Sequence, residues 1–218
     1  MSKKYATNTV IAFFALLMFF SCSLFTEPEE EEAPPDSSTQ RKPNIYIYPE
    51  EDAELTIKID FPNGGRVTVS DPDYNQGWDI SVSSAGVIDD KYTFLFYECK
   101  TPNLCQYDEG WVVDREALSS FFESNLHELN FRDHELTDFL DYWIPRLNTS
   151  DKYIIYPQYS DILEEMSRIK CTPSPLNINR ICYVIRKFSS ELSRPKEPAT
   201  RMFDRAGFHI MEWGVIWE

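Results

Sequence analysis

The segment NIYIYPEEDAELTIKID, residues 44–60, sets the pattern from which the fold can be predicted. Isoleucine and tyrosine alternate from residue 45 to residue 48, and apolar and polar residues alternate again from Leu55 to Asp60. A period of two is typical of β-strands, in which successive side chains point to opposite faces of a sheet. Asn63-Gly64-Gly65 follows as a hairpin-type turn. The segment therefore predicts a domain that begins with antiparallel strands near residue 44.

The β-type pattern continues downstream of this turn. Apolar and polar residues alternate at residues 67–69 and 78–82, and the run YTFLFY at residues 92–97 has the length and composition of a buried strand. Trp111-Val112-Val113 is the last apolar segment of this kind before the pattern changes. Short strands separated by polar turns are typical of an antiparallel sheet or a small sandwich.

From residue 114 the apolar spacing becomes helical. Leu118, Phe122 and Leu126 recur every four residues, and a second apolar stripe runs from Leu136 to Trp143. Strand-like and helix-like segments then alternate, at residues 152–156, 160–169, 178–188 and 207–213. We therefore predict one α+β domain over residues 44–218, with an antiparallel sheet or small sandwich in residues 44–113 and a mixed helix–strand half in residues 114–218.

The N-terminus has the pattern of an export signal. Lys3 and Lys4 precede eleven consecutive apolar residues, Val10–Phe20. At 1.5 Å per residue this run covers about 16 Å, roughly half of a bilayer core, so residues 1–21 are predicted to be a signal peptide and not a membrane span. Ser21-Cys22 at its end resembles the lipobox of bacterial lipoproteins, which implies cleavage before Cys22 and acylation, palmitate included, of its thiol. An ordinary signal with an incidental Cys22 and a short uncleaved anchor are the alternatives.

Residues 22–43 are predicted to be a disordered, acidic and Pro-rich tether. The run EPEEEE at residues 27–32 and the run APPDSS at residues 33–38 have no hydrophobic periodicity. Repulsion between like charges and the stiffness of proline favour an extended, solvated chain. We interpret the segment as a spacer between lipid and domain, with an interaction tail as the alternative.

The charge of the chain excludes one class of partner. The formal net charge is −15, and it becomes −17 without the leader, because Lys3 and Lys4 are two of the 21 basic residues. A field of this sign repels nucleic-acid phosphates and anionic headgroups. We therefore expect no nucleic-acid partner, and we expect membrane attachment through the N-terminal lipid and not through a basic patch.

Cysteine usage is compatible with an oxidising compartment. If Cys22 is acylated, four cysteines remain: Cys99, Cys105, Cys171 and Cys182. An even number in an exported chain indicates disulfides, and proximity in the sequence favours the pairs Cys99–Cys105 and Cys171–Cys182 among the three possible pairings. Four free, buried thiols are the alternative.

Several segments together resemble an uncharacterised family of bacterial proteins that carries KPxIYxYP, YWxPRL and GFxxxEWG motifs. These segments are KPNIYIYP (residues 42–49), NQGW (75–78), YTFLFYE (92–98), YWIPRL (142–147) and RAGFHIMEWG (205–214). The resemblance implies a domain boundary near Lys42 and no particular chemistry.

Two glutamates follow strongly apolar runs and are candidate site residues. Glu98 ends YTFLFYE, and Glu212 follows Phe208–Met211. A carboxylate in such surroundings must be paired, hydrogen-bonded or raised in pKa, and Arg146 and Arg205 are candidate counter-ions. If both glutamates met in one cleft, with Arg146 orienting one of them, they could act as acid and base in glycan hydrolysis. The alternative is a pair of structural salt bridges.

The loop at residues 71–79 is the one candidate cation site. Asp71, Asp73, Asn75 and Asp79 have part of the spacing of a calcium loop. The glycine is displaced by one position, and Val82 stands where a bidentate glutamate belongs, so turn chemistry explains the sequence equally well. We predict no further metal site and no cofactor, because the chain contains none of the usual zinc, phosphate-loop or dinucleotide motifs.

These observations predict a cell-envelope lipoprotein, on the bacterial cell membrane or outer membrane and facing away from the cytoplasm. A binding or structural role is favoured, with an envelope protein or a cell-wall glycan as the partner. The alternative is a glycan-type envelope hydrolase that uses Glu98 and Glu212.

Overall fold

The computed structural model describes residues 37–218, and the predicted signal peptide, Cys22 and tether residues 22–36 lie outside this range. The described residues form an α+β domain, as predicted. Its elements are β1 (Ser37–Tyr48), β2 (Ala53–Asp60), β3 (Arg66–Asp71), β4 (Trp78–Val82), β5 (Leu95–Pro102), β6 (Trp111–Asp114), a 3₁₀ turn (Arg115–Ala117), α1 (Leu118–Glu128), α2 (Asp133–Trp143), β7 (Lys152–Tyr159), α3 (Ser160–Met166), β8 (Arg168–Thr172), β9 (Asn177–Lys187) and β10 (His209–Trp217).

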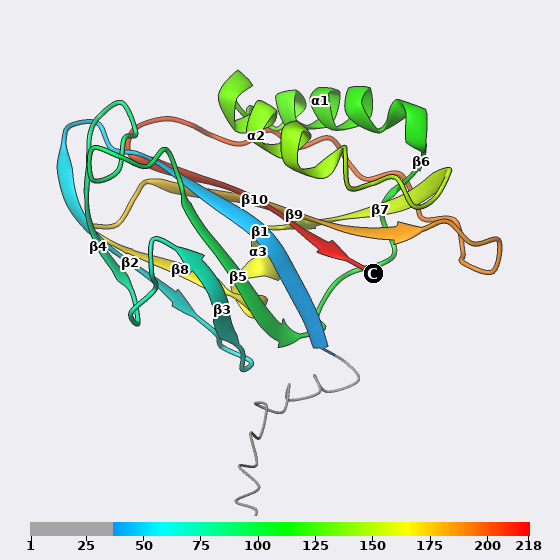
Figure 1. The fold of residues 1–218 in the computed structure, drawn as a ribbon, viewed down its shortest axis with the longest axis horizontal. Helices are drawn as coiled ribbons and strands as arrows, with labels where there is room; N and C mark the ends of the chain where they lie inside the picture. Colours follow the sequence, from blue (N-terminus) through cyan, green and yellow to red (C-terminus); the bar gives the residue numbers. More distant parts are fainter. Residues whose placement is uncertain (1–36) are drawn as a thin grey trace, which may run out of the picture. The chain divides into compact units, whose positions relative to one another are not determined.

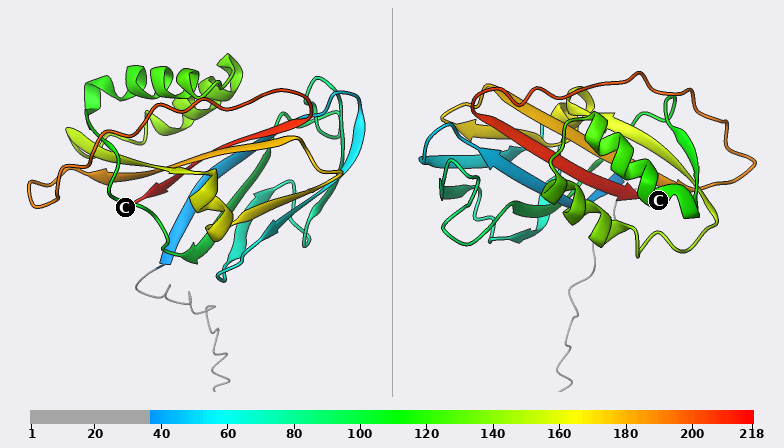
Figure 2. Two further views of the ribbon diagram at one scale, coloured as in Figure 1. Left: turned by 180° about the vertical axis from the view of Figure 1, so that it is seen from behind. Right: turned by 90° about the horizontal axis from the view of Figure 1, so that it is seen from above.

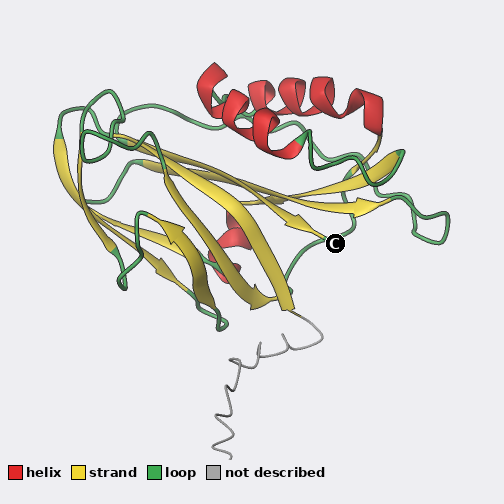
Figure 3. Cartoon of the chain, in the orientation of Figure 1, coloured by secondary structure: helices red, strands yellow, loops and turns green. Residues whose placement is uncertain are grey.

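A seven-stranded sheet is the centre of the domain, in the order β3-β5-β1-β10-β9-β7-β6. Helices α1 and α2 cover one of its faces, and the three-stranded sheet β4-β2-β8 lies against the other (Figures 1 and 3). Strands β9 and β10 are parallel, whereas the other neighbours in both sheets are antiparallel. A parallel pair requires a crossover, and residues 188–208 provide it as a long connection past α1 and α2 (Figure 2).

The alternation in β1 separates two hydrophobic cores. Tyr46 and Tyr48 point toward the helices, and Ile45 and Ile47 point toward the small sheet. All four side chains are buried, because the large sheet is covered on both faces at β1.

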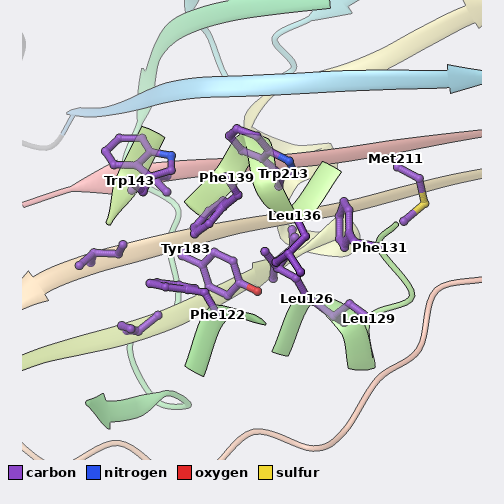
Figure 4. Close-up of a cluster of buried hydrophobic side chains, with 14 of the residues drawn as sticks. Phe122, Leu126, Leu129, Phe131, Leu136, Phe139, Trp143, Tyr183, Met211 and Trp213 are labelled. Carbon is purple, nitrogen blue, oxygen red and sulfur yellow. The ribbon is translucent and has the colours of Figure 1, made fainter. Parts of the chain in front are cut away.

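The helix side of the large sheet is an aromatic core (Figure 4). Phe122 on α1 and Phe139 on α2 meet with ring centroids 4.8 Å apart, and both rings contact Tyr183 on β9. Phe139 also packs edge-on against Trp213 on β10, at 5.2 Å. Aromatic edge-to-face contacts of this kind add to the energy of burial and fix how the two helices lie on the sheet.

The structure places the start of the domain earlier than predicted. Strand β1 begins at Ser37, so residues 37–43, which we assigned to the tether, form part of the large sheet. Ser38 and Gln40 are buried, and the Ser38 hydroxyl contacts that of Thr101 at 3.2 Å. The polar N-terminal part of β1 therefore pairs with β5, although it lacks the alternating apolar pattern from which a strand would be predicted.

The two halves of the chain also share one sheet and do not form separate layers. The last strand, β10, lies between β1 and β9 and joins the N-terminal strands to the C-terminal ones. Within residues 37–218, no helix combines the length and the apolar character needed to cross a bilayer.

Candidate functional site

The two glutamates proposed as a catalytic pair lie on opposite faces of the large sheet. Glu212 pairs with Ile45 in the β1–β10 ladder, and Ile45 pairs with Leu95 on β5, so all three side chains face the small sheet. Glu98 is three residues beyond Leu95 on β5 and therefore points to the helix side. The sheet separates the two carboxylates, and they share no cleft.

Glu212 is locked in an ion pair between the sheets. The Arg180 Nε atom donates to its carboxylate at 2.5 Å, and the Tyr97 hydroxyl donates to the other oxygen at 2.7 Å. Arg180, Tyr97 and Glu212 are all fully buried, and Arg180 also donates to the backbone carbonyl of Ser167. Burial alone would lower the pKa of Arg180, but the charge of Glu212, the hydrogen bond to it and the neighbouring Tyr97 and Glu164 together outweigh burial, and the pKa is raised. Burial raises the pKa of Tyr97, so the phenol beside this ion pair stays neutral.

Arg146, which only the hydrolase alternative assigns to orient one of the glutamates, contacts neither of them in the structure. Its Nη1 atom donates to the backbone carbonyl of Tyr142 at 2.6 Å, and its guanidinium lies 3.7 Å from the Tyr142 ring centroid. Arg146 therefore packs on the C-terminal end of α2. The catalytic constellation of Glu98, Glu212 and Arg146 is not assembled.

On the helix face, Lys42 occupies an aromatic cage. Its Nζ atom lies 5.2 Å from the ring centroid of Phe94, 4.7 Å from that of Phe96 and 5.1 Å from that of Tyr142. Burial lowers the pKa of Lys42, while nearby carboxylates, Asp138 first among them, act in the opposite direction. The cage is filled by the protein's own ammonium group, which pins the irregular part of β1 to β5 and α2.

In the candidate calcium loop, two residues have hydrogen-bond partners within the protein. Asp79 accepts a hydrogen bond from the Thr56 hydroxyl at 2.6 Å, and the Trp78 indole donates to the carbonyl of Pro72 at 2.8 Å. Across residues 37–218, no three His, Cys, Asp or Glu side chains lie close enough to share a metal ion. Asp71 ends β3 and Asp79 lies on β4, so Asp73 and Asn75 belong to the connection between these two strands.

The four cysteines of the domain are free thiols, so the predicted pairs Cys99–Cys105 and Cys171–Cys182 are not formed. Cys171 lies on the small sheet and Cys182 on the large one, where they belong to different hydrophobic clusters. The Cys99 thiol donates to the side-chain oxygen of Gln40 at 3.6 Å. Burial raises the pKa of both Cys99 and Cys105 to about 12, which keeps these thiols protonated and unreactive at neutral pH.

A second buried carboxylate, Glu135, organises a polar cluster outside the candidate sites predicted from the sequence. Glu135 lies in the first turn of α2 and is fully buried. It accepts hydrogen bonds from the Tyr48 hydroxyl at 2.5 Å, from the backbone N–H of Arg132 at 2.7 Å, and from both terminal nitrogens of Arg205 at 2.8 and 3.0 Å. These contacts tie the start of α2 to β1 and to the 188–208 connection. Burial and the charge of Glu135 raise the pKa of Tyr48.

Two histidines extend this cluster. His134 is exposed, and its Nε2 atom lies 2.9 Å from the Tyr48 hydroxyl. Since Tyr48 donates its proton to Glu135, Nε2 of His134 is the donor in this contact. A hydrogen-bonded chain thus runs from surface to core, from His134 through Tyr48 to Glu135.

His209 lies beside Tyr48 and is only 5 % exposed. The two rings stack with centroids 5.1 Å apart, and Nδ1 of His209 is 2.7 Å from the carbonyl of Gly207. The Nε2 atom of His209 is buried and has no hydrogen-bond partner among residues 37–218. Burial lowers the pKa of His209, and the charges of Arg205 and Arg132 lower it further.

The sequence contained two signals for this cluster. His134-Glu135 lies at the start of an amphipathic helix, where a glutamate in the first turn is a capping residue, and Tyr48 alternates with buried isoleucines. The periodicity indicates the strand and the helix but does not place Tyr48 opposite Glu135 of α2, because that contact joins residues 87 positions apart.

Comparison with known proteins adds no assignment: no family model, no curated protein and no solved structure matches this chain.

Proposed function

We propose that this chain is a lipid-anchored protein of the bacterial cell envelope, attached through Cys22, whose domain binds a partner or has a structural role and is not catalytic. The anchor rests on the leader: Lys3, Lys4, the apolar run Val10–Phe20 and the Ser21-Cys22 dipeptide. The acidic composition favours a protein or neutral glycan partner over nucleic acid.

The observation that supports the non-catalytic role is the state of the buried carboxylates. Glu212 and Glu135 are the two fully buried acidic residues of the described domain, and each is neutralised by its own arginine and by a tyrosine hydroxyl. A general acid or base needs a proton that can exchange with substrate. Side chains that are saturated by partners inside the fold instead serve stability and specificity.

The anchor is tested by replacing Cys22 with serine in the full-length chain. The unmodified protein should incorporate labelled palmitate and sediment with membranes, and Cys22→Ser should abolish the label and move the protein out of the membrane fraction. Cys105→Ser, a half-buried cysteine of the domain, is the matched control and should change neither result. Retention of the label in Cys22→Ser would refute lipidation at this residue.

The binding role is tested by thermal shift of the purified full-length protein against cell-wall sugars and peptides. A ligand that binds only the folded state at 100 times its Kd adds about 2.7 kcal/mol to the free energy of unfolding, which moves Tm by several degrees. A hydrolytic activity that disappeared in both Glu98→Gln and Glu212→Gln, with folding intact, would overturn the non-catalytic proposal.

One observation favours a second candidate, proton transfer at His134. The chain from His134 through Tyr48 to Glu135 orients an exposed imidazole, as a general base requires. His134→Gln tests it directly, because His134 is exposed and its loss should leave the fold intact. A hydrolytic activity of the purified protein that survives His134→Gln would remove this candidate.

A further inference from the structure

A small cleft opens where the C-terminal half of α1 faces β6, β7 and the long crossover connection. Its volume is about 70 Å³. Its walls include Trp111 at the start of β6, Asn125 and Glu128 on α1, Tyr159 at the end of β7, and residues 197–201 of the connection. Four segments that are distant in the sequence therefore bring polar and aromatic side chains to one place.

The outer wall of the cleft, which the crossover connection provides, is held by backbone hydrogen bonds on both sides. On one side, the Gly110 N–H donates to the carbonyl of Lys196, and the Lys196 N–H donates to the carbonyl of Asp108, both at 2.8 Å. On the other side, the Phe203 N–H donates to the carbonyl of Leu129 at 3.4 Å. Because both ends of the wall are fixed, the cleft is part of the folded domain and needs no rearrangement to admit a ligand.

Tyr159 is the residue that most directly points to a ligand in this cleft. It is only 5 % exposed, and within residues 37–218 no group forms a hydrogen bond with its hydroxyl. Buried hydroxyl groups in folded proteins normally have a partner. Burial raises the pKa of Tyr159, so the phenol stays protonated at neutral pH and can both donate and accept. A polar ligand group in the cleft would supply a partner.

Three further lining side chains have unused hydrogen-bonding groups. Oδ1 of Asn125 accepts from the Tyr183 hydroxyl at 2.5 Å, which orients the amide, and no acceptor in the described part of the chain contacts its Nδ2. Glu128 and Glu197 lie in the same cleft, and among residues 37–218 neither carboxylate has a hydrogen bond or an ion pair. The cleft therefore offers an N–H donor from α1 and carboxylate acceptors from two of its walls.

The charges around the cleft disfavour ionic ligands of either sign. The carboxylates of Glu128 and Glu197 repel an anion. Arg201 repels a cation, because its guanidinium lies 4.0 Å from the Tyr159 ring centroid and is held there by Asp161, at 3.7 Å from its Nη1 atom. A neutral ligand with both donors and acceptors is therefore the class that suits this cleft.

Sugar hydroxyls have these properties. Each hydroxyl both donates and accepts, so one edge of a sugar ring can donate to a carboxylate and accept from an amide N–H. The volume of about 70 Å³ is a little over twice the roughly 30 Å³ that a water molecule occupies in the liquid, so the cleft admits two hydroxyls and not a whole ring. Trp111 adds an apolar surface for the C–H groups of the ring that stays outside.

We propose that this cleft binds a neutral sugar, at the end or at a branch of a glycan, which enters with two neighbouring hydroxyls. These hydroxyls form hydrogen bonds with Tyr159 and Asn125 and with the carboxylates of Glu128 and Glu197, while Trp111 packs against the ring. The inference rests on the proposed binding role, and it names the ligand class and the place on the domain where that ligand binds.

The test is a ligand-observed NMR titration of the purified full-length protein, in a detergent without sugar groups. The probes are the methyl glycosides of glucose, galactose and mannose, together with N-acetylglucosamine, and at least one of them should bind. Tyr159→Phe removes only the hydroxyl and should weaken binding of that sugar about fivefold, whereas Glu197→Gln removes a charged acceptor and should weaken it about tenfold. Tyr142→Phe on α2 and Glu123→Gln, exposed on α1 outside the cleft, are the matched controls and should leave Kd unchanged. An unchanged Tm in all four variants shows that the fold is intact.

Three outcomes would overturn the assignment of the cleft. The first is that none of the four sugars binds, and the second is that a sugar binds equally well to Tyr159→Phe and Glu197→Gln, which would leave the binding role standing and place it elsewhere on the domain. The third is that tetramethylammonium or acetate binds in place of the sugars and is lost in the same two variants. A hydrolytic activity that disappeared in Glu98→Gln and Glu212→Gln would refute the non-catalytic role without changing the sugar result, because neither glutamate lines the cleft.

Discussion

The two fully buried carboxylates are paired with arginine in the same way but differ in their access to solvent. Glu212 and its partner Arg180 both have fully buried side chains and lie between the two sheets. Glu135 is equally buried, but Arg205 is 10 % exposed and lies at the start of α2. The Glu135 pair is also connected through Tyr48 to the exposed His134.

This difference indicates two kinds of polar core. A pair sealed between sheets can only serve the fold, because no ligand or proton donor reaches it without unfolding. At the start of α2, water can reach the Glu135–Arg205 pair. If one partner is removed, water can therefore hydrate the remaining group, and protons can exchange with solvent. Site-directed changes at equivalent positions of the two pairs can establish whether solvent access separates them.

Removing the arginine of the sealed pair should have the largest effect. Arg180→Met leaves the Glu212 carboxylate buried with only the Tyr97 hydroxyl as partner, and we expect a loss of about 3–5 kcal/mol in the free energy of unfolding. Urea denaturation followed by tryptophan fluorescence measures it, since Trp213 is on the same strand as Glu212.

The double variant Arg180→Met with Glu212→Leu is the control for this change. It removes both charges, so most of the lost stability should return, because a buried ion pair replaced by apolar groups of similar volume is often neutral. If the double variant were as unstable as Arg180→Met, the loss would reflect packing and not an unpaired charge.

The same change at the second pair should cost less. Arg205→Met leaves Glu135 with the Tyr48 hydroxyl and the Arg132 N–H, and water can approach the vacated side, so we expect a loss of about 2 kcal/mol. Urea denaturation under identical conditions allows direct comparison with Arg180→Met. Equal losses at the two arginines would show that solvent access does not distinguish the pairs.

The sequence predicted the positions of the strands better than it predicted which strands pair with each other. The alternation of Ile45, Tyr46, Ile47 and Tyr48 correctly indicated a strand with two different faces, because burial on both sides leaves a local signature. The polar N-terminal part of β1, which begins at Ser37, has no such signature in the sequence. The partner of Glu212 was equally hidden: Arg180 lies opposite it only because β9 and β10 pair in parallel across the long 188–208 connection.

The candidate site shows the same limit. The apolar run before Glu212 indicates that this carboxylate needs a counter-ion, with Arg205 as one candidate, but Arg205 pairs with Glu135 instead. Such choices depend on strand order and register, which arise from contacts distant in the sequence. Glu98 shows a second limit of the sequence pattern. It follows an apolar run, yet its side chain points to the face of the large sheet opposite Glu212.

The link between the Glu135 pair and the surface should contribute less than either arginine. Tyr48→Phe removes one hydrogen bond to a buried carboxylate and frees His134, with an expected loss of about 1–2 kcal/mol by urea denaturation. Tyr46→Phe is the matched control on the same face of β1, since the Tyr46 hydroxyl donates to Asp138 at 2.9 Å, where the carboxylate is only half-buried. If Tyr46→Phe lowered the free energy of unfolding as much as Tyr48→Phe, the hydrogen bond from Tyr48 to the buried Glu135 would contribute no more than one to a half-buried carboxylate.

The smallest effect we expect is a pH dependence at His209, and its sign follows from the lowered pKa. The unfolded chain takes up a proton on this imidazole near pH 6.5, whereas the folded protein resists it to lower pH, because His209 is buried against Arg205 and Arg132. Below about pH 6.5 the unfolded state therefore binds more protons, and stability falls as pH falls until the folded pKa is passed, with a slope of at most about 1.4 kcal/mol per pH unit.

His209→Phe preserves stacking on Tyr48 but cannot ionise, so the stability difference between this variant and the unmodified protein should change between pH 7 and pH 5. The exposed His127 provides the control, because His127→Gln should leave that slope in place. A difference that stayed constant across this range would show that His209 accepts a proton in the folded protein as readily as in the unfolded chain, and the Glu135 cluster would then resemble the sealed pair in its indifference to pH.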